Sequence, residues 1–206
     1  MSKTLSPPQI KTTSAVILAG GRGQRMDEQD KGWIKFNNST LIEHTLQRLQ
    51  QQITDIHISA NRQLEQYQQL GVKVIADQHP DFPGPLAGIY AALHQMKTDW
   101  LLTLPCDCPL FPADLLSRFI DALTEHPQAI AVACDEKYMQ PVFCLIHRSL
   151  EDDLKNFLDQ GGHKTGQWIR QQHPVEVKFD NDALQFFNIN SPEDLVNFNQ
   201  QREALD

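Results

Sequence analysis

The stretch that decides the fold is SAVILAGGRGQRM, residues 14–26. Its first six residues are small or apolar, which indicates a buried β-strand. Glycines follow at once, and they allow the backbone to turn tightly so that its N–H groups can face phosphates. Arg25, together with Lys31 a few residues later, would add the positive charge that a triphosphate requires. The stretch therefore predicts a phosphate-binding turn; a plain glycine turn between a strand and a helix is the simpler alternative.

Two well-known phosphate loops do not fit the spacing of this turn. The dinucleotide-binding pattern GxGxxG would need a third glycine where the chain has Met26. The P-loop pattern GxxxxGK[ST] would need its second glycine where the chain has Arg25. The turn therefore belongs to neither class.

Short apolar runs alternate with amphipathic stretches along the rest of the chain. We expect strands at residues 14–19, 56–60, 72–76, 100–104, 129–134, 142–146 and 175–179, and an extended stretch at 184–188. We expect helices at residues 41–50, 63–70, 86–96, 112–125, 150–158 and 165–171, and a last helix that begins with a capping box at Ser191 and Asp194. This alternation predicts an α/β fold in three layers, with a mostly parallel twisted sheet and helices on both faces. Ligands bind such sheets at the carboxyl ends of the strands, where Gly20, Asp77 and Asp107 stand.

Length and composition indicate one soluble globular domain over residues 1–206, with residues 1–13 as a flexible arm. The formal net charge of −8 argues against a general nucleic-acid binder, which would need a basic surface. No apolar run resembles a signal peptide or is long enough to span a bilayer. The four cysteines form no CxxC pair, so we expect reduced thiols in a cytoplasmic protein.

Several further motifs follow in a fixed order. The chain contains LAGGRGQRM at 18–26, DKG at 30–32, ISANR at 58–62, VIAD at 74–77, FPGPLAG at 82–88, LPCDCP at 104–109 and NINSPEDL at 188–195. This series resembles the motifs of the molybdenum cofactor guanylyltransferases over residues 14–198, because several motifs coincide in the same order.

The resemblance implies a Rossmann-like nucleotidyltransferase fold and a magnesium-dependent enzyme. Its expected reaction transfers GMP from GTP to the phosphate of molybdopterin, or of Mo-molybdopterin, and releases pyrophosphate. The expected partners are therefore GTP, the pterin, and cofactor-delivery or acceptor molybdoenzyme proteins, with neither nucleic acid nor membrane.

The resemblance also implies roles for individual residues. Asp107 is expected to be the Mg²⁺ ligand, and Lys31 and Arg25 are expected to act with it in catalysis. The expected GTP contacts are Leu18, Ala19, Gly20, Gly21, Lys31, Asn61, Asp77 and Asp107, the first three largely through backbone groups. Asn188 and Asn190 are expected on the pterin side or near the metal. From the residues alone, an aspartate after a strand is more often a turn former or a helix cap than a ligand.

One departure from the family pattern concerns the loop before Asp30. The family usually has a Gly-Gly pair there, whereas this chain has Asp27 and Glu28. Two carboxylates would weaken the affinity for a triphosphate unless they point to solvent. These two residues leave open a nucleotide-binding module without catalysis. A related transferase for another base or acceptor, cytidylyl or sugar-phosphate, is the other open alternative.

Overall fold

The fold is built on one seven-stranded sheet. The computed structural model describes residues 5–20, 30–76, 84–179 and 184–203. Along the sheet the strands follow the order β5 (Lys73–Ile75), β4 (Ile56–Ser59), β1 (Thr13–Leu18), β6 (Trp100–Pro105), β8 (Met139–His147), β7 (Ile130–Cys134) and β9 (Val175–Lys178). The described pairs are parallel except those made by β8, which runs antiparallel to β6 and β7. The predicted mostly parallel sheet is confirmed.

Helices cover both faces of this sheet, so the predicted three layers are also confirmed. One face is covered by α1 (Leu41–Leu49), α2 (Leu64–Gln68) and α4 (Leu115–Glu125), and the other by α3 (Pro85–Gln95), α5 (Glu151–Asp159) and α6 (Thr165–Gln171). Successive side chains of β1 alternate between the faces, since Ala15 and Ile17 enter the first core and Val16 enters the second. No helix in the described ranges is long and apolar enough to cross a membrane.

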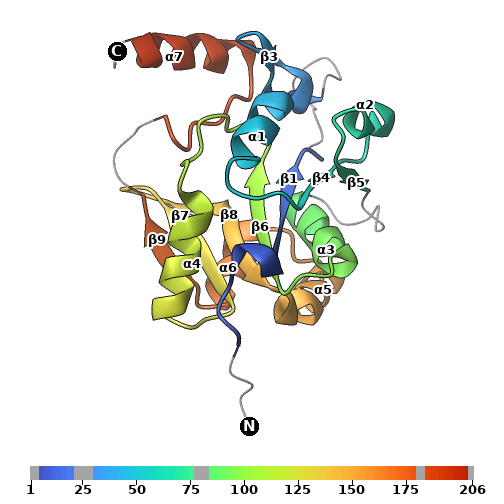
Figure 1. Cartoon of the computed structure of the whole chain (residues 1–206), viewed down its shortest axis with the longest axis vertical. Helices are drawn as coiled ribbons and strands as arrows, with labels where there is room; N and C mark the ends of the chain where they lie inside the picture. The colour runs from blue at the N-terminus through green and yellow to red at the C-terminus, as the bar shows by residue number, and fades with distance from the viewer. Residues whose placement is uncertain (1–4, 21–29, 77–83, 180–183, 204–206) are drawn as a thin grey trace.

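A third, smaller core lies at the end of the molecule to which the arrowheads of β1 and β6 point (Figure 1). It joins α7 (Pro192–Glu203) to a hairpin of β2 (Lys35–Phe36) and β3 (Ser39–Thr40). Phe36 packs edge-on against Phe198 of α7, with ring centroids 5.4 Å apart. The other buried members of the cluster are Ile34, Leu41, Leu184 and Ile189. This core therefore holds α7 and the residues before it against the start of α1.

The start of α4 differs from the prediction. The helix begins at Leu115 rather than at Pro112, because a side chain from outside the helix organises its first turn. The amide of Gln52 accepts a hydrogen bond from Leu116 N at 2.9 Å and donates one to Pro112 O at 3.1 Å. The proline therefore lies in the turn before the helix.

The segment at residues 184–188 also differs from the prediction, because it is a turn rather than an extended stretch. Phe187 N donates to Leu184 O at 3.2 Å and closes the turn. Leu184 and Ile189 both enter the third core, and the turn brings these two side chains to the same cluster.

The segment before β1, which we predicted to be a flexible arm, contacts the body over part of its length. It contains a 3-10 turn (Ile10–Thr12) and a buried Pro8. The indole of Trp100 donates to Ser6 O at 3.3 Å. These contacts lie at the end of the sheet opposite to α7 (Figure 1).

Gly88 of α3 lies directly against the sheet, and replacing it should destabilise the fold. A Cβ atom at this position would come 2.5 Å from Ser59 Oγ and 2.9 Å from Leu18 Cδ2. We expect Gly88→Ala to lower the free energy of unfolding by about 1–3 kcal/mol in urea denaturation. Gly166→Ala in α6 is the matched control, because its nearest contact would be Arg170 Nη1 at 3.5 Å, and alanine should gain up to about 1 kcal/mol there. An unchanged unfolding midpoint for Gly88→Ala would contradict this packing.

Candidate active site

Four neighbouring strands end at the same level of the sheet. Leu18 of β1 is paired with Ser59 of β4 and with Pro105 of β6, and Ser59 is paired with Ile75 of β5. The chain proceeds from β1 to β4 and β5 on one side and returns to β6 on the other, so the strand order reverses between β1 and β6. Ligands of open α/β sheets bind outside the carboxyl ends of the strands at such a reversal. This edge is the candidate site.

Backbone hydrogen bonds extend the sheet by one residue beyond the paired strands. Ala19 N donates to Ser59 O at 2.8 Å, and Cys106 N donates to Leu18 O at 3.2 Å. The Ala19 N–H, which we expected to face a nucleotide, is therefore engaged within the sheet. Gly20 follows these bonded residues directly, and it is exposed.

Asp107 lies in the turn after β6 and is largely withdrawn from water, with 14% of its side chain exposed. Its backbone O accepts a hydrogen bond from Ile189 N at 2.8 Å, and the O of Cys106 accepts one from Thr45 Oγ1 at 3.3 Å. Burial raises the pKa of the Asp107 carboxyl because desolvation penalises its charged form, while the nearby Lys31 opposes the rise. The ionised carboxylate therefore depends on a cation beside it.

That cation is Lys31, the first residue of a 3-10 turn (Lys31–Trp33). Its Nζ lies 3.5 Å from Asp107 Oδ2 and also donates a hydrogen bond to Asn190 Oδ1. The Asp30 carboxylate caps the turn by accepting from Gly32 N at 3.2 Å. Lys31 thus connects the turn after β6 with the residues before α7, which are 76 and 159 positions away along the chain.

Asn190 is held by the cap of α7. Ser191 Oγ accepts a hydrogen bond from Asp194 N at 3.1 Å, as the predicted capping box requires. The reciprocal bond reaches one residue further back than in a standard box, because Asp194 Oδ2 accepts from Asn190 N at 2.9 Å. The cap therefore fixes the backbone of the residue whose side chain contacts Lys31.

The structure brings several of the predicted site residues together. Lys31, Asp107 and Asn190 form one connected group. Gly20 and Asn61 lie side by side after β1 and β4, since a Cβ atom at Gly20 would be 3.5 Å from Asn61 Nδ2. Both groups lie at the carboxyl edge of the sheet.

The other predicted residues are placed differently or are not described. Asn188 is exposed, two residues before Asn190. Gly21, Arg25 and Asp77 lie outside the described residues, so the GTP contacts of Gly21 and Asp77 and the catalytic role of Arg25 stay predictions.

The donor atoms at this edge fit a hard cation held by few protein ligands. Asp107 offers one carboxylate, and no group of three or more His, Cys, Asp or Glu side chains that could hold a metal occurs in the described part of the chain. Burial raises the pKa of the Cys106 and Cys108 thiols well above the usual value for cysteine, so both thiols stay protonated. Mg²⁺ commonly uses one or two carboxylates with water and substrate phosphates, whereas structural zinc uses a closed set of thiolates and imidazoles.

Sequence reasoning did not identify the residues that pack around the group of Lys31, Asp107 and Asn190. Asp30 could have been found, because an aspartate before a tight turn often caps the backbone two residues on. Thr45 and Tyr67 carry no comparable signal, since each is a single inward-facing residue of a helix.

Comparisons with known proteins identify the family of this chain. The model of the MobA-like NTP transferase domain matches residues 15–176. The molybdenum cofactor guanylyltransferase of Ralstonia nicotianae is 46% identical over 198 residues, which cover 92% of this chain and 97% of that protein. The protein of the same name from Shewanella baltica is 44% identical over 179 residues, covering 87% and 91%.

Solved structures show the same fold. Molybdopterin-guanine dinucleotide biosynthesis protein A from Archaeoglobus fulgidus superposes with a TM-score of 0.75 at 23% identity, covering 93% of this chain and 99% of that one. A nucleotidyl transferase from Methanothermobacter superposes with a TM-score of 0.71 at 18% identity, covering 95% and 99%. With a family model that spans most of the chain and relatives above 40% identity, this protein belongs to the MobA-like NTP transferase family.

Proposed function

We propose that this protein transfers GMP from GTP to the phosphate of molybdopterin and releases pyrophosphate. The observation that carries the proposal is the contact of Lys31 with the buried carboxylate of Asp107, at 3.5 Å, on the sheet edge where this class of fold binds ligands. Guanine and molybdopterin as substrates are supported by the names of the relatives, molybdenum cofactor guanylyltransferases.

The reaction requires alignment and charge neutralisation more than proton removal. The acceptor is a phosphate monoester, which is already ionised at neutral pH and can attack the α-phosphorus of GTP without a general base. Negative charge develops on the departing pyrophosphate, so a fixed cation close to it lowers the barrier.

Lys31 would supply that cation. Its ammonium pairs with Asp107, and Asn190 Oδ1 accepts a hydrogen bond from it on the side of α7. A phosphate oxygen can take over as the partner of the ammonium, because a charge-assisted hydrogen bond to phosphate is as strong as one to carboxylate. The remaining proposed roles follow the sequence: nucleotide contacts at Leu18, Ala19, Gly20, Gly21, Asn61 and Asp77, a catalytic role for Arg25, and a place on the pterin side or near the metal for Asn188 and Asn190.

Asp107 is proposed to hold Mg²⁺. When bound, the metal would supply positive charge that offsets the charge of the phosphates. The protein's own contribution is to keep the carboxylate in a fixed turn, through the bonds of Ile189 N to Asp107 O and of Thr45 to Cys106 O.

We further propose that the product passes to cofactor-delivery or acceptor molybdoenzyme proteins and that the reaction takes place in the cytoplasm. The first proposal follows from the activity, since a guanylylated pterin has to reach the enzymes that use it. The second is supported by the four cysteines, which are free and buried, as is usual in a reducing compartment.

A nucleotide panel tests the proposed function. With Mg²⁺ and molybdopterin, we expect GTP to release pyrophosphate at least about tenfold faster than ATP, CTP or UTP, because each base-edge partner left unpaired costs about 1–3 kcal/mol. Parallel reactions without molybdopterin separate transfer from hydrolysis. Preference for CTP would replace guanylyl by cytidylyl transfer, and release that does not depend on molybdopterin would refute the acceptor.

Asp107→Ala should abolish turnover without lowering stability. We expect kcat to fall by about 10²-fold or more, the scale for losing one electrostatic stabiliser. The free energy of unfolding at pH 7 should stay level or rise, because the raised pKa of Asp107 means that folding disfavours its charged form. Asp114→Ala, an exposed carboxylate at the start of α4, is the control and should keep full activity. An active Asp107→Ala variant would show that the metal ligand lies elsewhere.

Lys31→Ala should lower kcat more than it weakens GTP binding. The ammonium is expected to interact more strongly with the transition state than with bound triphosphate, and such a loss commonly costs about 10²–10³ in rate. Lys31→Arg keeps the charge but spreads it over a larger planar group, so it should recover only part of the rate. Steady-state kinetics distinguish the outcomes: a raised KM with unchanged kcat would make Lys31 a uniform binding contact instead.

A further inference from the structure

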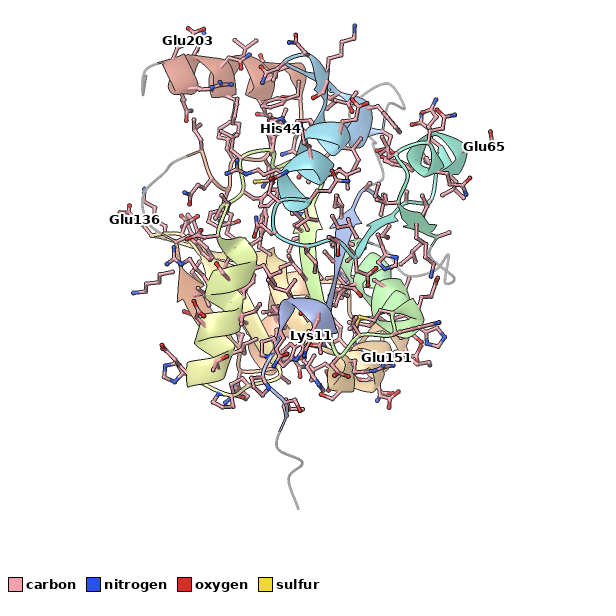
Figure 2. The ribbon with its side chains drawn as sticks, in the orientation of Figure 1. Lys11, His44, Glu65, Glu136, Glu151 and Glu203 are labelled. Carbon is pink, nitrogen blue, oxygen red and sulfur yellow. The ribbon has the colours of Figure 1, made fainter. Side chains whose placement is uncertain are left out.

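The turn that carries Lys31 rests on a buried tyrosine. Tyr67 belongs to α2 and is fully buried, whereas Glu65 of the same helix points away from the molecule (Figure 2). Its ring packs against Trp33, the last residue of the turn, with ring centroids 4.9 Å apart. A Cβ atom on Gly32 would come 2.6 Å from Tyr67 Oη. The hydroxyl therefore occupies the space in which any side chain at residue 32 would begin.

The polar group beside this hydroxyl is the Asp30 carboxylate, which caps the same turn. Burial raises the pKa of Asp30, and the interaction with Tyr67 opposes that rise, although Tyr67 Oη makes no hydrogen bond of good geometry within the described ranges. The hydroxyl therefore adjoins both Gly32 and the carboxylate that caps the turn, and this position points to a steric role in the site.

Gly32 connects the hydroxyl to the placement of Lys31. The Gly32 N–H donates to the Asp30 carboxylate at 3.2 Å, which closes the turn over Lys31. Gly32 itself is buried, with Tyr67 Oη on one side and Ile42 Cβ at 3.4 Å from where its own Cβ would be. The turn is therefore confined both by its cap and by its support.

We propose that Tyr67 is a positioning residue for Lys31: its hydroxyl sets the height of the turn of residues 30–32 and so fixes the ammonium opposite the reacting phosphates. The inference rests on the proposed function, because it assumes that the Lys31 ammonium acts in transfer. Glycine at position 32 follows from it, since the hydroxyl leaves no room for a side chain.

The test replaces the Tyr67 hydroxyl by a methyl group at residue 32, so that the same space is filled from the other side of the contact. Gly32→Ala adds a methyl group that collides with the hydroxyl, and Tyr67→Phe removes the hydroxyl. In the double variant the methyl group occupies the vacated space, because the next contacts of that Cβ would be 3.4 Å and 3.5 Å. Gly162→Ala is the matched control: its methyl group would collide with the ring of Phe157, in the connection from α5 to α6, away from the site.

Pyrophosphate release, GTP binding and thermal unfolding are measured for each variant. We expect Gly32→Ala to lower kcat by at least about tenfold, since a misplacement of about 1 Å can cost up to ~10²-fold. Tyr67→Phe should lower kcat less than Gly32→Ala does. The double variant should exceed Gly32→Ala in both kcat and melting temperature. Gly162→Ala should lower the melting temperature and leave kcat unchanged.

A second comparison separates positioning from simple packing. If Gly32→Ala acts through the ammonium, it should change kcat by less than about twofold once Lys31 is alanine, because the two substitutions then remove the same interaction. A residue that only fills the core would lower kcat by the same factor in both backgrounds. If Gly32→Ala does not fold, Tyr67→Phe is compared with the double variant, which should be the faster.

The outcomes separate the two proposals. If the native enzyme releases no pyrophosphate from GTP and molybdopterin, the proposed function is refuted. The melting temperatures of the native protein, Gly32→Ala, Tyr67→Phe and the double variant still test the contact between Gly32 and Tyr67. If the native enzyme is active, either of two results refutes the positioning role alone. The first is a kcat of Gly32→Ala within about twofold of the native value, and the second is a double variant whose kcat is no higher than that of Gly32→Ala.

Discussion

A carboxylate that is mostly withdrawn from water needs a cation close by, and Asp107 imposes this requirement on the whole carboxyl edge of the sheet. Lys31 meets it, held by the turn that Asp30 caps, and Asn190 fixes the ammonium from the other side. The Asp107 backbone holds the segment before α7 through Ile189. Four parts of the chain that are distant in sequence, the ends of β1 and β6, the turn of residues 30–32 and the start of α7, are thereby fixed around one buried charge.

The site lowers the stability of the fold, and burial of apolar side chains in the two main cores offsets this loss. The pKa values of Asp107 and Asp30 are both raised, chiefly because burial desolvates their carboxylates. The strands beneath them are almost fully buried, with Ala15, Val16 and Ile17 inaccessible to water. Strands buried to this degree can hold charged groups in positions that destabilise the fold. Transfer between phosphates requires this preorganisation of charged groups.

Much of the fold could be predicted because apolar runs report buried strands directly. The expected helix at 165–171 matches α6, and every expected strand from 14–19 to 175–179 is present with small shifts at its ends. Hydrophobic periodicity does not report the direction of a strand, so the antiparallel orientation of β8 could not be predicted. A strand of two residues, such as β2, is too short to show a period. The start of α4 depends on Gln52, far away in sequence. At the site, motifs predicted Lys31, Asp107 and Asn190 singly, but their mutual contact, the engagement of Ala19 N–H by Ser59 O, and the support by Tyr67 arise only from tertiary packing.

We expect the phosphates of the nucleotide to bind at the Lys31–Asp107 pair. A crystal structure with Mg²⁺ and a GTP analogue that cannot be cleaved at the α-phosphorus would show where they bind. We expect an α-phosphate oxygen within hydrogen-bonding distance of Lys31 Nζ and the metal on Asp107, with Asn190 still beside the ammonium. A nucleotide bound elsewhere, with Lys31 and Asp107 still paired to each other, would contradict it.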